Sequence, residues 1–105
     1  MTTPEPSCQA AFERAGFKLE KTGGGCSAWV MRLRNGRETW VSCDLNAPNA
    51  LTDPCHIATY ARGENGSVSE LDMTDSFQVK FFLEWLEIEA SKTGKNPRQI
   101  MEEIR

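Results

Sequence analysis

Residues 26–44, CSAWVMRLRNGRETWVSCD, hold two alternating apolar runs joined by Asn35-Gly36. Asn-Gly between such runs is a strong signal for a β-hairpin, because both central residues of a type I′ turn need a positive φ. With these two residues as the loop, Arg34 faces Arg37, and the pairs Met31–Trp40, Val30–Val41 and Ala28–Cys43 follow. The two-residue period of a strand then predicts the faces of the hairpin. One face holds Trp29, Met31, Leu33 and Trp40, and the other holds Ala28, Val30, Val41 and Cys43.

The chain on both sides of this hairpin predicts further short strands. Residues 17–21 alternate, with Phe17 and Leu19 facing inward, and the glycines at 23–25 predict a hairpin connection. Turn-forming residues dominate 46–54, which we expect to be a long connection. Residues 55–62 predict a fourth strand, with Ile57 on one face and His56 and Tyr60 on the other. A turn is expected at 63–66. Residues 67–71 are compatible with a short fifth strand at the sheet edge, and the sequence does not decide whether it forms.

The sequence also predicts three helices. Ser7 caps the first, over residues 8–15, which ends before Gly16. Asp75 and Gln78 resemble a capping box for a second helix over residues 76–92, which Gly94 ends. The apolar residues of this main helix cover more than one stripe, so it either is deeply packed or offers a second apolar surface. Asn96-Pro97 opens the last helix, with Gln99 placed to complete a capping box.

Together these elements predict a single α+β domain over residues 1–105, with residues 1–6 disordered. We expect an antiparallel meander of four or five strands, with the N-terminal helix and the two C-terminal helices packed mainly on one face. This arrangement buries the apolar stripes of all the elements. We also expect Trp29, Met31 and Trp40 to meet the helices and to dominate the stability of the core.

The composition is that of a slightly acidic soluble protein, with 39% hydrophobic residues, 26% charged residues and a net charge of −3. Residues 1–44 have six basic and five acidic side chains, whereas residues 45–105 have six and ten. This balance argues against direct nucleic-acid binding. No apolar run reaches the roughly 18 residues of a membrane helix, and the N-terminus lacks the pattern of a signal peptide. We therefore expect a cytoplasmic protein with reduced thiols and no cofactor.

Four cysteines and one histidine raise the hypothesis of a thiol- or zinc-dependent enzyme. Its candidate residues are Cys26, Cys43, Cys55 and His56, as a metal site or as a nucleophile with its base. However, no two cysteines form a C-x-x-C pair, and His56 directly follows Cys55. Cysteines in such a pattern are more often small buried hydrophobic residues. We therefore expect neither a catalytic site nor a metal site.

Two charged clusters are candidates for binding a partner. Arg32, Arg34 and Arg37 lie at the tip of the central hairpin, where they would grip an acidic partner or protect a strand edge from aggregation. The acidic residues of the second half include Glu84, Glu87 and Glu89 on the main helix. As one contiguous face these glutamates would bind a basic groove, whereas scattered glutamates would serve solubility.

The segment GFKLEKTGGGCSAW, residues 16–29, followed by a strand, a turn and a second tryptophan strand, resembles short uncharacterised proteins encoded by phages and bacterial mobile elements. The resemblance covers about the first 45 residues and includes no catalytic motif. It implies a small accessory protein that acts by binding, as anti-CRISPR proteins do when they block host defence complexes. The leading hypothesis is therefore a non-enzymatic protein-binding module of the phage inhibitor or regulator type. A homodimer that pairs through sheet edges or through the main helix is a further hypothesis.

Overall fold

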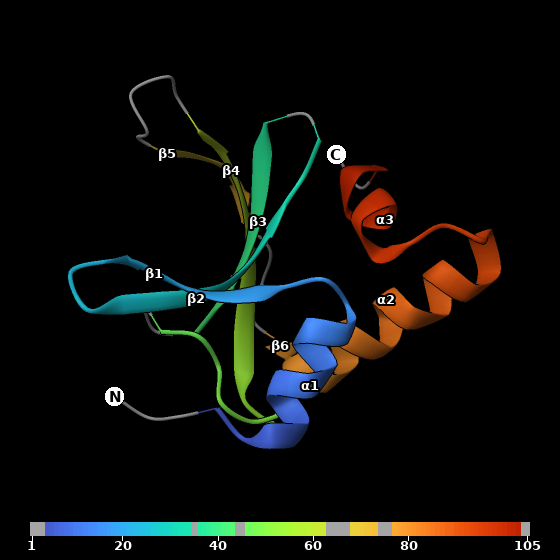
Figure 1. Ribbon diagram of the computed structural model, residues 1–105, viewed down its shortest axis with the longest axis horizontal. Coiled ribbons are helices and arrows are strands. Elements are labelled where there is room, and N and C mark those ends of the chain that lie inside the picture. The colour runs from blue at the N-terminus through green and yellow to red at the C-terminus, as the bar shows by residue number, and fades with distance from the viewer. Residues whose placement is uncertain (1–3, 35, 44–45, 63–67, 74–76, 104–105) are drawn as a thin grey trace.

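The computed structural model describes residues 4–34, 36–43, 46–62, 68–73 and 77–103 of the chain. Its elements are α1 (Pro6–Arg14), β1 (Lys18–Gly23), β2 (Cys26–Arg32), β3 (Arg37–Ser42), β4 (Pro54–Arg62), β5 (Val68–Met73), β6 (Phe77–Gln78), α2 (Val79–Thr93) and α3 (Pro97–Glu103). The strands pair antiparallel in the order β1-β2-β3-β4-β5, and β6 also pairs with β4. The helices gather on one side of this sheet (Figure 1). The predicted α+β meander is confirmed, and the short edge strand exists as β5.

The connection between β1 and β2 is a tight turn made by two glycines. Gly23 pairs with Cys26, so Gly24 and Gly25 are the two loop residues. Their φ angles are +59° and +83°, the left-handed values that both central residues of a type I′ turn require. The hairpin connection predicted from the glycines is therefore confirmed.

The β2–β3 hairpin has a loop of three residues, and the predicted two-residue loop is wrong. The Leu33 N–H donates to the Arg37 carbonyl at 2.9 Å, which leaves residues 34–36 as the connection. Gly36, with a φ of +81°, supplies the left-handed residue that commonly ends a three-residue loop. Because Gly serves both loop lengths, the Asn-Gly signal located the turn but not its length.

The longer loop shifts the strand pairing by one residue. Val30 pairs with Trp40 and Trp29 with Val41, so the cross-strand pairs expected from a two-residue loop are wrong. Since side chains alternate, a shift of one exchanges the two faces of β3 relative to β2. Trp29 and Val41 therefore face the helices together. The expectation that Trp40 also meets the helices is wrong, because Trp40 lies on the opposite face of the sheet with Val30.

The core between sheet and helices centres on Trp29, which has 0% of its surface exposed. Its ring stacks on Phe12 of α1 at a centroid distance of 4.7 Å, and Phe12 meets Phe17 edge to face at 5.5 Å. The Trp29 indole N–H donates to the Pro48 carbonyl at 3.1 Å, so this buried donor has its partner. The other strands and helices contribute Met31, Val41, Ile57, Val79, Phe82, Leu86, Ile100 and Met101.

The start of α2 differs from the predicted start at residue 76. Phe77–Gln78 pair with β4 as strand β6, so the helix begins at Val79. The N-cap residue makes no side-chain hydrogen bond. Instead, the N–H groups of Val79 and Lys80 donate to the main-chain carbonyls of Asp53 and Leu51, each at 2.9 Å. These long-range bonds satisfy the donors that a capping box would otherwise satisfy.

The other helix ends follow local sequence signals. α1 begins at Pro6, so Ser7 lies inside the helix and does not cap it; a proline at the first helical position needs no N–H partner. α2 ends at Gly94 as predicted, with a φ of +72°. The capping box of α3 is confirmed. The Asn96 N–H donates to Gln99 Oε1 at 2.9 Å, and the Gln99 N–H donates to Asn96 Oδ1 at 2.8 Å.

Two expectations about the N-terminal region also change. Disorder was expected over residues 1–6, of which 1–3 lie outside the described residues. The Glu5 N–H donates to the Asn49 carbonyl at 2.8 Å, and Pro6 begins α1. Leu19 was expected to be inward. It pairs with Trp29 and so lies on the helix side, but 44% of it is exposed because it lines a hollow there. The turn expected at 63–66 and the capping residue Asp75 lie outside the described residues.

We predict that Trp29→Ala lowers the free energy of unfolding by about 3–5 kcal/mol, because it removes a fully buried ring and leaves a cavity. The measurement is urea denaturation followed by circular dichroism. Trp85→Ala is the matched control, since that ring is exposed on α2, and its cost should stay below about 1 kcal/mol. Equal costs for the two tryptophans would contradict the assigned core.

Candidate interaction surface

The outer face of α2 carries a stripe of large apolar side chains. Phe81, Trp85 and Ile88 are 54%, 39% and 57% exposed, and we call these three residues the α2 stripe. Their spacing of four and three residues places them on one face of the helix. The other side of α2 packs into the core through Val79, Phe82 and Leu86. Of the two alternatives for the main helix, the structure shows the second, an additional apolar surface.

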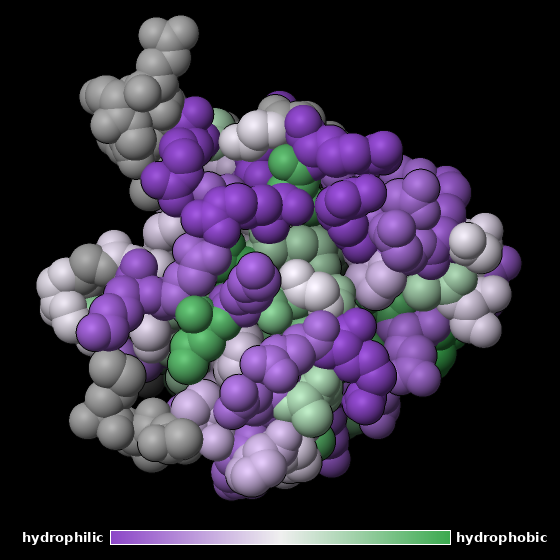
Figure 2. Space-filling model, viewed as in Figure 1, coloured by the Kyte–Doolittle hydropathy of each residue, from purple (hydrophilic) through white to green (hydrophobic). Residues whose placement is uncertain are grey.

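Large exposed apolar side chains are rare elsewhere on the described surface. Among the residues whose exposure the structure describes, which leaves out 68–73 and 77, Leu19 on β1 is the one other member of this class. Figure 2 shows one face of the molecule, on which hydrophilic residues dominate and apolar residues appear as small separate patches. Single exposed apolar residues are normal, whereas several on one helix face indicate a contact surface.

Acidic side chains border the α2 stripe. At about 100° per residue, Glu84 and Glu89 lie on either side of the stripe, and Glu87 lies further round the helix beyond Glu84. Glu84 and Glu87 are exposed, while Glu89 is half-buried and pairs with Lys92 at 3.3 Å. All three glutamates predicted to bind a partner are therefore on the helix that presents the apolar stripe.

The three arginines of the hairpin point to different parts of the molecule. Arg32 binds Glu20 at 2.5 and 3.0 Å on the sheet face away from the helices. Arg34 donates its backbone N–H to Glu102 of α3 at 2.8 Å and its guanidinium at 3.1 Å, which lowers the pKa of the Glu102 carboxyl. Arg37 is half-buried and also has an interaction within the chain. The arginines therefore hold the hairpin within the fold.

Sequence reasoning missed a buried carboxylate on the sheet face away from the helices. Glu38 on β3 is 3% exposed. Its oxygens accept hydrogen bonds from Arg62 at 2.6 and 3.0 Å and from the Trp40 indole N–H at 2.9 Å, and Arg32 lies 3.6 Å away. The bonds from Arg62 lower the pKa of the Glu38 carboxyl, with burial opposing them. The strand register could have revealed this site, because the correct pairing places Glu38 opposite Arg32 on β2 and opposite Tyr60 on β4.

The Cys55 thiol and the His56 imidazole lie on different faces of the sheet. Cys55 and His56 are successive residues of β4, so the Cys55 side chain enters the core and the His56 side chain points away from it. Cys26 is half-buried beside Trp40, also on the face away from the helices. Burial raises the pKa of Cys55 to about 12 and that of Cys8 to about 11, so both thiols stay protonated at neutral pH. Within the described part of the chain, no three His, Cys, Asp or Glu side chains are grouped to hold a metal ion.

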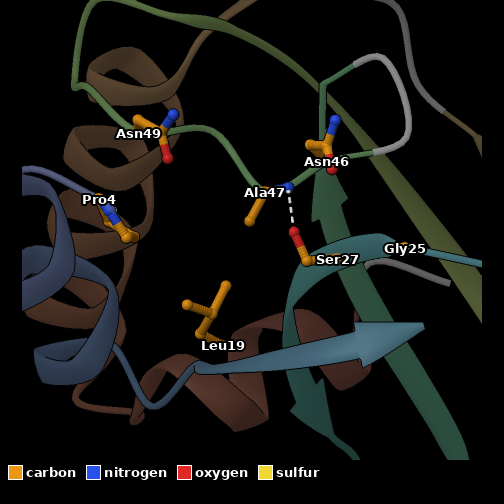
Figure 3. A pocket seen from close by; sticks show the side chains of 7 residues that line it. All are labelled: Pro4, Leu19, Gly25, Ser27, Asn46, Ala47 and Asn49. Atoms are coloured by element: carbon orange, nitrogen blue, oxygen red, sulfur yellow. Dashed lines mark hydrogen bonds between the residues drawn. The ribbon is translucent and has the colours of Figure 1, made fainter. Parts of the chain in front are cut away.

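A hollow of about 330 Å³ lies beside β1 on the helix side (Figure 3). The exposed Leu19 side chain points into it, and the Ser27 hydroxyl at its wall accepts the Ala47 N–H at 3.0 Å. The residues that line it are Pro4, Leu19, Gly25, Ser27, Asn46, Ala47 and Asn49. None of these side chains is a general acid or base, so the hollow suits an uncharged group rather than a reaction.

Comparisons with known protein families, curated proteins and solved structures give no significant match to this chain. Among the described residues, no helix is both long and apolar enough to cross a membrane. The interpretation of function therefore depends on the surfaces described above.

We predict that Glu38→Gln reduces the loss of unfolding free energy that occurs as the pH falls below about 4.5. The Glu38 pKa is below its ordinary value of 4.5 in the folded protein. The unfolded chain therefore takes up this proton first as the pH falls, so the contribution of Glu38 is complete above about pH 4.5 and is lost below it. Urea denaturation between pH 3 and 7 should show a steeper loss for the wild type than for the variant. Parallel curves would contradict this role.

We also predict that the Cys8 and Cys55 thiols react with Ellman's reagent at least about a hundredfold more slowly than an exposed thiol at pH 7.5, because thiolate is the reacting species. All four cysteines of the chain should react promptly in denaturant. Cys8→Ser should remove one slowly reacting thiol from the native protein, whereas Cys26→Ser should leave both slow thiols in place. Four fast thiols in the native protein would contradict the burial of these two residues.

Proposed function

We propose that this protein is a non-enzymatic module that binds another protein through the α2 stripe. The observation that carries the proposal is the clustering of Phe81, Trp85 and Ile88 on one solvent-facing side of a single helix. Exposing large apolar side chains to water is unfavourable in the unbound state. Aromatic side chains are also among those that most often contribute strongly to binding energy at protein interfaces.

The border of the α2 stripe defines the chemistry of the partner. Glu84 extends from α2 into solvent beside the apolar side chains, and Glu87 extends into solvent further round the helix. A complementary surface is an apolar groove with lysine or arginine at its rim. Nucleic acid is a poor partner for this surface, because its negatively charged phosphates would be repelled by these carboxylates and by the net charge of −3.

α2 is well suited to present a rigid contact surface. Its core side is fixed by Phe82 and Leu86, and its first N–H groups are bonded to the carbonyls of Leu51 and Asp53. A helix that is already held in place loses little conformational entropy when it enters a groove. This preorganisation supports binding through side chains on the outer face without a change in the fold.

The narrower form of the proposal is a phage-type inhibitor or regulator, for example one that acts on a host defence complex. Its support is the resemblance of residues 16–29 to proteins of phages and mobile elements, together with a small size and an acidic balance. An inhibitor of this kind needs only one rigid contact surface to cover a functional groove of its target. The α2 stripe meets that requirement.

The test is affinity capture from a bacterial lysate, followed by a binding measurement with each purified captured protein. We expect a specific partner that the wild type retains and that Phe81→Ser/Trp85→Ser/Ile88→Ser loses. In the direct measurement, Trp85→Ala alone should weaken binding at least about tenfold, as expected for an aromatic anchor. Glu84→Lys should weaken binding in a manner that depends on salt concentration.

Leu19→Ser is the matched control, because it removes an exposed apolar side chain from β1 rather than from α2. It should leave binding unchanged, and all variants should keep the wild-type circular dichroism spectrum. A partner that binds the triple variant as well as the wild type would contradict the proposal. So would a stable wild-type dimer that Trp85→Ala dissociates, since a second copy would then occupy the α2 stripe.

A further inference from the structure

The end of β3 and the start of β4 bring two cysteines together. The β3–β4 register runs from Arg37 opposite Ala61 to Ser42 opposite His56. One further step in the same register places Cys43 opposite Cys55. Burial raises the pKa of the Cys55 thiol, and the electrostatic influence of Cys43 and of Cys8 adds to this effect, which agrees with the placement from the register.

The type of pairing at this step favours a bond between the two side chains. The Leu33–Arg37 hydrogen bond shows that odd-numbered residues of β3 turn their backbone groups toward β2. Cys43 follows this pattern, because its N–H and C=O are bonded to Asn46 at 2.6 and 2.9 Å. Cys43 and Cys55 therefore face each other as a non-hydrogen-bonded pair, for which the Cα atoms lie about 4.5 Å apart. That separation falls inside the range that a disulfide spans.

Both side chains point to the same face of the sheet. Val41 and Ile57, two pairs earlier, are both in the core on the helix side. Two residues along each strand, Cys43 and Cys55 return to that side. Cys55 is fully buried, whereas Cys43 is half-buried.

We propose that Cys43 and Cys55 are an oxidative modification site, which a two-electron oxidant of the peroxide class converts into a cross-strand disulfide. All four cysteines are thiols in the present structure. The Cys43 thiolate attacks one peroxide oxygen, the O–O bond breaks, and the Cys43 sulfenic acid and one water form. The Cys55 sulfur then displaces the hydroxyl from that sulfenic acid, the S–S bond forms, and a second water leaves. In total two thiols lose two protons and two electrons, and the peroxide is reduced to two waters.

The disulfide would close the covalent loop that contains residues 46–53. This segment accepts the indole N–H of Trp29 at Pro48 and the first N–H groups of α2 at Leu51 and Asp53. A link between its two ends restricts the unfolded chain and so stabilises the folded state. The high pKa of the Cys55 thiol makes the second step slow at neutral pH and faster as the pH rises.

The test is treatment of the whole protein with hydrogen peroxide at pH 8.5, followed by mass spectrometry and thermal unfolding. We expect a mass decrease of about 2 Da, the loss of two thiols, and a melting temperature higher by several degrees. Dithiothreitol should reverse all three changes. Cys43 and Cys55 share one tryptic peptide, residues 38–62, but cleavage before Asp44 and Asp53 separates them unless the disulfide joins them.

Cys43→Ser should abolish these changes, and Cys26→Ser, which alters another half-buried thiol, should preserve them. Cys8→Ser should also preserve them and excludes a link from Cys8 to Cys55. If Cys43→Ser fails to fold, the peptide map of the wild type still decides the question. A link that involves Cys8 or Cys26, or a Cys43 that proceeds to sulfinic acid without any disulfide, would overturn the proposal.

Discussion

The hydrogen bond from the Trp29 indole to the Pro48 carbonyl is the interaction around which the rest of the structure is arranged. On one side, the indole ring stacks on Phe12 and so ties α1 to β2. On the other side, it fixes the segment 46–53. In this segment the Asn49 carbonyl accepts the Glu5 N–H, and the Leu51 and Asp53 carbonyls accept the first N–H groups of α2. The Asp53 carboxylate holds this segment in shape by accepting the N–H groups of Asn49 and Ala50, each at 3.0 Å. A connection without a helix or strand thus joins α1 and α2 to the sheet.

Much of the fold could be predicted from the sequence, because it depends on neighbours along the chain. The strands follow a two-residue period, the turn at Gly24–Gly25 needs positive φ values, and the Asn96–Gln99 capping box spans only three residues. The register of β2 against β3 could not be predicted in this way. Loops of two and three residues carry similar signals but differ by one residue, and that residue decides which face receives Trp40.

Interactions between distant residues explain the other differences. The start of α2 depends on carbonyls at Leu51 and Asp53, which no local pattern around residue 76 can indicate. The cluster around Glu38 depends on Arg62, 24 positions along the chain, and becomes visible only when the register is known. For the candidate surface, the sequence indicated surplus apolar residues on the main helix. It could not show that Phe81, Trp85 and Ile88 are the exposed ones, because Phe82 and Leu86 beside them are equally apolar and are buried.

The way in which α2 is anchored has a consequence for how such a protein can diversify. Its first turn is secured by peptide carbonyls, which neither titrate nor change when a side chain is replaced. Substitutions on the outer side of the helix therefore leave its position unaltered, so the lineage can exchange Phe81, Trp85 or Ile88 without rebuilding the scaffold. The exposed apolar stripe and the core-facing residues occupy separate sides of the same helix, so the outer surface can change while the architecture persists.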